Sequence, residues 1–240
     1  MPRLSERARR RAAAKLLSVP MRAEARYVRT LRSLARESAS EVLSLLLART
    51  DASAPGGYAE HVERIIEGVR IRVGVAFDRH AAELSKANGK AMRVQGIQAS
   101  DLGLDAVIAK RRAENVDLVV KAQRIYAASV KEVFEDPSND GLAVDVLKGK
   151  LLERGSVSES RAELIARDQT LKMNGEITKT RQENAGIDSY VWTTASDERV
   201  RDEHAALDGE TFSWSSPPSV GHPGADYQCR CVAIPVIPDL

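Results

Sequence analysis

The contrast between residues 190–240 and the rest of the chain limits the fold most. Both tryptophans, both cysteines, two of the four histidines and five of the nine prolines fall in this stretch. The residues before it are mostly Ala, Leu, Arg and Glu in helical patterns, and aromatic residues are only 4% of the 240-residue chain. A core with few rings suits helix-on-helix packing better than a sandwich or barrel. We expect a mainly α fold: an elongated helical N-terminal region, then a small α+β C-terminal domain with short strands and irregular loops.

Apolar spacing predicts the helices. They are expected over residues 3–17, 21–49, 58–88 and 114–134, separated by Pro20, by the break at 54–57 and by a stop at Asn88-Gly89. The second has a seam of Leu31, Leu34, Ser38, Val42 and Leu45, and the fourth has Leu118, Ala122, Ile125 and Val133 aligned.

The sequence indicates a domain boundary at the strong turn over residues 136–141. We expect a helical N-terminal region over 1–140 and a second domain over 141–240. In the latter, a short helix over 142–153 should end at Arg154-Gly155, and a new helix should begin near Ser160, which has capping-box spacing to Glu163, and end at Gly186.

The end of the chain alternates between strand and turn signals. Residues 190–194 are β-prone and aromatic, a short helix should run from Ser196 or Asp197 to Ala206, and 211–214 should form the return strand. A last strand is expected over 231–236, with Pro235 marking it as an edge strand.

Positive charge is concentrated at the N-terminus. Residues 1–36 hold eleven Lys or Arg against Glu6 and Glu24, a surplus of +9 in a chain of net charge +2. Arg22, Arg26, Arg29 and Arg36 form a stripe on one helix face. This basic arm (residues 1–36) is either a solvated face or a surface for an anionic partner, such as double-stranded DNA or an acidic protein.

The sequence shows no signal for membrane insertion or secretion, which bears on where the protein is made. No apolar run approaches the roughly 20 residues of a membrane span, and no signal peptide is visible. Two cysteines separated by one residue cannot form a disulfide framework. We expect a protein made in the cytoplasm with reduced thiols and no membrane partner.

Four soft-metal ligands gather near the C-terminus. His204, His222, Cys229 and Cys231 lie within 28 residues, and an extended Cys-Arg-Cys points both thiols to one face. These residues could hold a structural zinc ion as a tetrahedral Cys2His2 set. The alternative is a metal-free, hydrogen-bonded cluster with two buried thiols.

Catalysis is a third interpretation of the same region. A thiol beside a histidine could act as a nucleophile pair, and Asp197, Asp202, Glu203 and His204 could hold a hard metal for hydrolysis. No nucleophile elbow or phosphate-cradling loop accompanies them, and the acidic run is explained as a charged helix start. We therefore expect no enzymatic activity.

The C-terminal half resembles a known family. Four segments carry the likeness: RAELIARDQTLKMNG (161–175), GIDSYVWTTASDERVRDEHAALDGETFSW (186–214), the proline pair at 217–218, and HPGADYQCRCVAIPVI (222–237), with a weaker NVDLV at 115–119. In this order they resemble the minor head, or head morphogenesis, proteins of tailed bacteriophages typified by protein F of phage Mu. The resemblance covers roughly residues 115–240.

The resemblance implies a virion structural protein at the portal vertex or capsid interior. Such a protein acts in procapsid assembly and in DNA packaging or delivery, with the portal, major capsid or scaffold protein as partners. It also implies a fold-defining cluster: Arg167, Asn174, Trp192, Asp197, Arg199, Arg201, Gly209 and Arg230. The competing hypothesis is a free DNA-binding protein with a zinc-stabilised C-terminal module.

Overall fold

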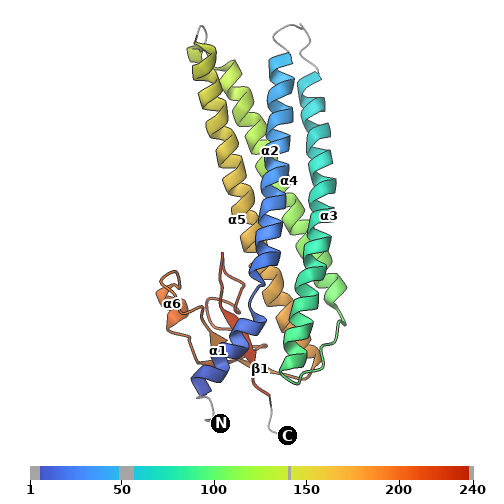
Figure 1. Ribbon diagram of the computed structural model, residues 1–240, viewed down its shortest axis with the longest axis vertical. Helices are drawn as coiled ribbons and strands as arrows, with labels where there is room; N and C mark the ends of the chain where they lie inside the picture. The colour runs from blue at the N-terminus through green and yellow to red at the C-terminus, as the bar shows by residue number, and fades with distance from the viewer. Residues whose placement is uncertain (1–5, 49–56, 140–141, 238–240) are drawn as a thin grey trace. The chain divides into compact units, whose positions relative to one another are not determined.

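A computed structural model describes residues 6–48, 57–139 and 142–237. The chain is mainly α-helical, with a small antiparallel sheet near the C-terminus, as expected (Figure 1). The α-helices are α1 (Glu6–Leu17), α2 (Met21–Ala48), α3 (Gly57–Val94), α4 (Leu104–Glu135), α5 (Val144–Asn184) and α6 (Asp202–Ala205), and a short 3-10 turn spans Pro137–Asn139. The strands are β1 (Ser189–Thr193), β2 (Thr211–Ser213) and β3 (Val232–Pro235).

The chain divides into two compact units that interleave in sequence. The first contains Met1–Glu24, Arg79–Arg111 and Arg167–Leu240, and the second contains Ala25–Asp78 and Arg112–Ala166. Helices α3, α4 and α5 each contribute residues to both units. The boundary between residues 140 and 141 stays a prediction, and residues 140 and 141 lie outside the described ranges.

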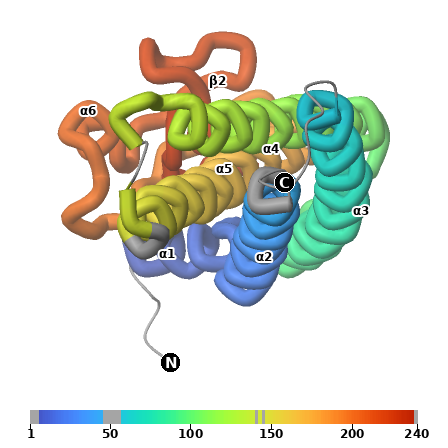
Figure 2. Tube along the Cα trace, turned by 90° about the horizontal axis from the view of Figure 1, so that it is seen from above, coloured from blue at the N-terminus to red at the C-terminus, as the bar shows by residue number. Residues whose placement is uncertain are grey.

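The second unit is a bundle of long helices. Figures 1 and 2 show α2, α3, α4 and α5 side by side there. The predicted seam of α2 is buried at Leu31, Leu34, Ser38 and Val42, while Leu45 is partly exposed. Most side chains in the core of the bundle are aliphatic, and two buried aromatic residues, Phe77 and Tyr27, meet edge-on with ring centroids 6.3 Å apart.

The seam predicted for α4 is wrong in part. Ala122 and Val133 are buried, but Leu118 and Ile125 are 40% and 47% exposed. The buried face instead includes Asn115 and Gln123, whose polar side chains are accommodated in the bundle. A search for apolar spacing misses a face that includes buried amides.

Two predicted helix ends are also wrong. Helix α3 continues through Asn88-Gly89 to Val94, and α5 is one helix through Arg154-Gly155. A glycine costs a helix only about 1 kcal/mol relative to alanine, which packing on both sides can offset. Leu151 and Ser158, on either side of Gly155, are buried, and Ser160 donates to the Ser156 carbonyl as a residue inside the helix rather than as its cap.

The first unit combines α1, the sheet and the nearby parts of α3, α4 and α5. The sheet has the order β2-β1-β3, with Tyr190 opposite Phe212 and Trp192 opposite Ala233. All three strands were predicted, and β3, which ends at Pro235, is an edge strand as expected. One apolar core cluster joins α1 to this sheet: Leu17, Ala91, Met92, Ile97, Ile187 and Ile234.

The predicted helix from residue 196 or 197 to 206 is much shorter in the structure. Only Asp202–Ala205 is α-helical. Ser196 has a positive φ of 55°, and the Asp197 carboxylate accepts a hydrogen bond from the Arg199 backbone N–H in a local turn. This side chain–backbone bond competes with the helix. Within the described ranges, no helix is long and apolar enough to cross a membrane.

Candidate functional site

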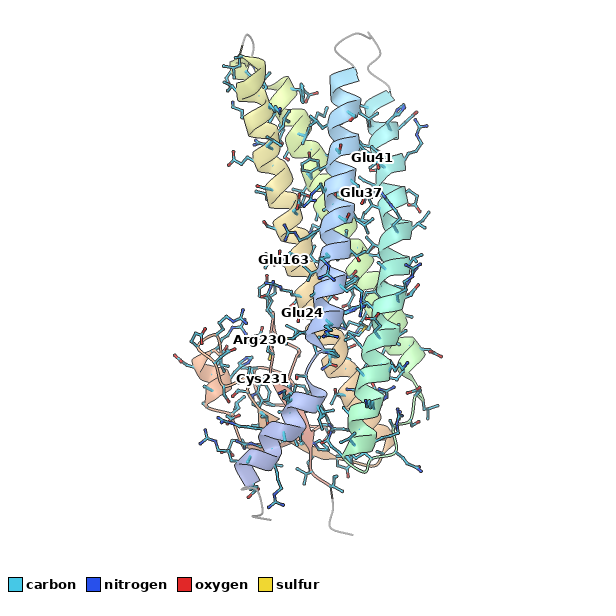
Figure 3. All side chains as sticks on the ribbon, viewed as in Figure 1. Glu24, Glu37, Glu41, Glu163, Arg230 and Cys231 are labelled. Carbon is cyan, nitrogen blue, oxygen red and sulfur yellow. The ribbon has the colours of Figure 1, made fainter. Side chains whose placement is uncertain are left out.

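The middle strand β1 positions the candidate site. Alternation along the strand places Tyr190 and Trp192 on one face, and both side chains are fully buried. They form a second core cluster with Trp214, Cys229, Cys231 and Ala233. Trp192, a member of the predicted fold-defining cluster, therefore lies in the centre of a buried group of side chains. Figure 3 labels Cys231 and its neighbour Arg230 in the C-terminal segment.

His204 meets the two cysteines inside this cluster. Its ring packs edge-on against Trp192 with centroids 5.4 Å apart, and only 2% of the residue is exposed. Nδ1 lies 3.5 Å from the Cys229 Sγ and 3.6 Å from the Cys231 Sγ. The ligand atoms of the three residues all lie within 4.8 Å of one another, so they form a group that could hold a metal ion.

The two thiols differ electrostatically. A hydrogen bond from Cys231 lowers the pKa of Cys229 to about 6 against the opposing effect of burial, and the Gly224 backbone N–H, 3.4 Å away, adds to the lowering. The hydrogen bond with Cys229 and the burial of the side chain raise the pKa of Cys231. A lowered pKa at Cys229 favours the thiolate, which is the form that binds metals.

His222 lies outside this group. Its Nδ1 is 2.9 Å from the Tyr190 hydroxyl and its Nε2 is 3.4 Å from the Lys179 Nζ. Its ring also stacks near Trp214, with centroids 4.8 Å apart. Burial first, and then the Lys179 charge, lower the pKa of His222. Of the four residues predicted as ligands, the structure brings together His204, Cys229 and Cys231.

Two ion pairs fasten the loops around the cluster. Arg230 donates to both oxygens of Asp197 at 2.5 Å, and this contact lowers the pKa of Asp197 to about 2. Arg201 donates to Asp226 Oδ2 at 2.8 Å and to the Tyr227 carbonyl at 2.7 Å. Of the predicted fold-defining arginines, Arg230 and Arg201 therefore make specific contacts, whereas the Arg199 side chain is exposed and its backbone N–H forms the local turn.

A buried polar stripe on α5 supports the same unit. Thr170, Asn174, Thr178 and Arg181 follow helical spacing and are all buried. Asn174, which was predicted, donates to the Leu17 carbonyl at 2.8 Å.

Arg181 is the buried hydrogen-bond centre of this stripe, and sequence reasoning missed it. It donates to the Ser85 carbonyl and hydroxyl, to Asn88 Oδ1 and to Asp101. Arg167, a member of the predicted fold-defining cluster, has a side chain 43% exposed and pairs with Glu24 at 3.7 Å. The signal that could have found Arg181 is its place in the polar stripe.

Two aspartates, Asp168 and Asp226, also contribute to this region, and Asp226 was absent from the predicted site. Asp168 is buried and accepts the Gln228 backbone N–H at 2.9 Å, so it ties α5 to the loop that precedes Cys229. Asp226 Oδ2 lies 3.4 Å from His204 Nε2. Its position follows from the loop geometry, which the spacing of residues does not reveal.

Gly209 is required by its backbone conformation. Its φ is +96°, which L side chains rarely adopt, and an added Cβ would also meet the flexible guanidinium end of Arg10. Arg10 donates to the neighbouring Asp208 at 3.1 Å. This contact joins α1 to the turn before β2.

The four arginines of the basic stripe differ in their surroundings. Arg36 donates to both oxygens of Glu159 at 2.8–2.9 Å, so its charge is neutralised by α5. Arg22, Arg26 and Arg29 lie on α2 with exposed side chains. Of the predicted hard-metal ligands, Asp202 is exposed and Asp197 is engaged by Arg230. Glu203, also exposed, and His204 lie with Asp226 in a second group whose ligand atoms are within 4.8 Å of one another and could hold a metal ion.

Comparisons with known proteins agree with the resemblance. Residues 128–234 match the sequence model of the family described as Phage Mu protein F like protein. A protein of Haemophilus influenzae (strain ATCC 51907 / DSM 11121 / KW20 / Rd), described as an uncharacterized protein, is 38% identical over 126 residues. That alignment covers 52% of this chain and 28% of the relative. No solved structure gives a significant match.

Proposed function

We propose that this chain is a structural head morphogenesis protein of a tailed phage and a component of the virion. The observation that carries the proposal is the match of residues 128–234 to Phage Mu protein F like protein. The arrangement around Trp192 supports the proposal. Buried aromatic rings, loops joined by ion pairs and buried thiols are suited to a structural domain. We propose no catalytic step for these residues.

The proposed location is the capsid interior or the portal vertex. There the chain would bind the portal protein, the major capsid protein or the scaffold protein during procapsid assembly, and would act in DNA packaging or delivery. The exposed Arg22, Arg26 and Arg29 favour an anionic partner, either packaged double-stranded DNA or an acidic protein surface. Arg36 contributes less because Glu159 neutralises it.

Zinc is the proposed cofactor of the domain. Two sulfur donors and one imidazole nitrogen suit Zn²⁺ better than the hard cations, which prefer oxygen. The ligands would be His204, Cys229 and Cys231, whose atoms already lie within 4.8 Å of one another. The ion would fasten the loop before β3 to α6.

Co-expression with the portal and capsid proteins of the same phage genome tests the role. Native mass spectrometry of the affinity-purified portal is expected to show this chain in a stoichiometric complex. The matched control is the same chain with Trp192→Ala, which removes a buried anchor and is expected to lose the complex. A wild-type chain that stays unbound by portal, capsid and scaffold proteins, yet binds duplex DNA, would favour the free DNA-binding protein instead.

A further inference from the structure

The surroundings of His204 assign a role to a residue outside the proposed ligand set. His204 offers its two ring nitrogens in opposite directions: Nδ1 faces both sulfur atoms, and Nε2 lies 3.4 Å from Asp226 Oδ2. Nε2 is buried and lacks a hydrogen bond of normal geometry among the described residues. A buried ring nitrogen beside a carboxylate is the arrangement that orients metal-binding histidines.

We propose that Asp226 is the positioning residue of the metal site, a proposal that rests on the proposed zinc site. Its carboxylate accepts the proton of His204 Nε2, which leaves the Nδ1 lone pair free for the metal between Cys229 and Cys231. A metal on Nδ1 would make Nε2–H a stronger donor, so the contact between Nε2 and Asp226 Oδ2, which is 3.4 Å in this structure, would be expected to shorten on binding. Asp226 itself stays outside the coordination shell.

The loop geometry supports this assignment. Arg201 donates to the same oxygen, Asp226 Oδ2, at 2.8 Å, and the Tyr227 backbone N–H donates to Oδ1. Arg201 also holds the Tyr227 carbonyl at 2.7 Å. The carboxylate is therefore fixed in place before any metal arrives, and it is fixed on the side of the imidazole away from the thiols.

His222 has a different surrounding. Both of its ring nitrogens already face protein groups, the Tyr190 hydroxyl and the Lys179 ammonium. A cation beside a ring nitrogen disfavours a second cation on that atom. The described residues thus supply three ligands and one outer carboxylate to this site, and a fourth position would be taken by water or another small donor.

Metal titration of the full chain tests the role of Asp226. Co²⁺ is the probe, because its visible ligand-field bands report tetrahedral coordination and its near-ultraviolet charge-transfer band reports thiolate ligation. Zn²⁺ affinity follows from competition with a chromophoric chelator under reducing conditions. Asp226→Ala is expected to weaken Zn²⁺ binding about 10- to 100-fold while the sulfur-to-cobalt band persists at saturation.

Arg201→Gln is the matched control. It removes the guanidinium that anchors the loop, while the Asp226 carboxylate and its hydrogen bond from the Tyr227 backbone N–H stay in the chain. Its affinity for Zn²⁺ is expected to fall less than that of Asp226→Ala. Equal weakening by Arg201→Gln and Asp226→Ala would mean that Asp226 acts only by anchoring the loop, and would overturn the proposal.

The tautomer of His204 provides a second measurement, because a role of Asp226 in loop anchoring alone would not change it. In the metal-free wild-type protein, ¹⁵N spectra of His204 are expected to show the Nε2–H form, and in Asp226→Ala a mixture of both tautomers. Asp226→Asn, which keeps the shape of the side chain, serves if the alanine variant fails to fold, and a smaller loss of affinity is expected for it.

The outcomes separate the two proposals. A wild-type chain that binds neither Co²⁺ nor Zn²⁺ would remove the proposed zinc site and Asp226's role with it. A wild-type chain that binds metal as tightly as Asp226→Ala would leave the zinc site standing and overturn only the assignment of Asp226.

Discussion

At the residue scale, the His204 cluster makes the metal-free and metal-bound alternatives distinguishable. Cys229→Ser keeps a small polar side chain but removes a soft ligand, so zinc should be lost and the melting temperature should fall to that of the chelator-treated wild type. Thermal denaturation with and without chelator checks this. A chelator that leaves the wild-type melting temperature unchanged would favour the metal-free thiol cluster.

Tyr27 gives a test in the helical bundle. Its hydroxyl donates to Asn115 Oδ1 at 2.6 Å, and both side chains are buried. Tyr27→Phe leaves the Asn115 oxygen unpaired and is expected to cost about 1–3 kcal/mol in urea unfolding. Tyr227→Phe is the control, because Tyr227 is 51% exposed and should change stability little.

Tyr27 also predicts a pH dependence. Burial raises the pKa of Tyr27 above its ordinary value of 10.0, although the Asn115 hydrogen bond opposes the shift. The folded state therefore keeps a proton that the unfolded state loses, so the stabilisation is complete below pH 10 and is lost as the pH rises above it. Urea unfolding across this range should show a steeper decline for the wild type than for Tyr27→Phe. Equal slopes would contradict the assignment.

At the element scale, two glycines predict opposite effects of the same substitution. Gly209→Ala strains a φ of +96° and meets Arg10, and is expected to destabilise by about 1–3 kcal/mol. Gly155→Ala lies inside α5 with nothing within 4 Å of the added Cβ, and is expected to stabilise by about 0.5–1 kcal/mol. Chemical denaturation of both variants checks the pair. A stabilised Gly209→Ala would contradict the backbone strain expected at this positive φ.

The buried stripe of α5 predicts an unequal cost for two arginines. Arg181→Met leaves the Ser85 and Asn88 oxygens without their donor and is expected to cost about 3–5 kcal/mol. Arg167→Met, at a half-exposed pair with Glu24, should change stability far less. Similar losses in the two variants would show that burial of Arg181 is not decisive.

Periodicity and turn residues predicted most helices and strands, but not the tertiary contacts between them. The strands around Trp192 and the seam at Leu31 follow from side-chain alternation and spacing. The uninterrupted α5 does not, because packing around Gly155 overrides a local preference. The separation of His222 from Cys229 depends on a loop path that no spacing encodes, since only the folded chain brings Asp226 rather than His222 to His204.

At the scale of the whole molecule, the charge of the basic arm can be separated from its fold. Replacing Arg22, Arg26 and Arg29 by Gln removes exposed cations and should leave the melting temperature nearly unchanged. If the arm binds DNA, each lost phosphate contact lowers the salt dependence of affinity by about one unit of logarithmic slope. Measuring the affinity for duplex DNA across a series of salt concentrations gives this slope. An unchanged slope in the variant would favour a protein as the partner of the arm.

The contacts of α1 with β3 and with the turn before β2 set an order of events during synthesis. Leu17 leaves the ribosome before Ile234 of the same core cluster, and Arg10 leaves it before its partner Asp208. Contacts between residues so far apart in sequence close slowly. Until they close, the cationic α1 segment of the nascent chain can neither bury Leu17 in this cluster nor pair Arg10 with Asp208.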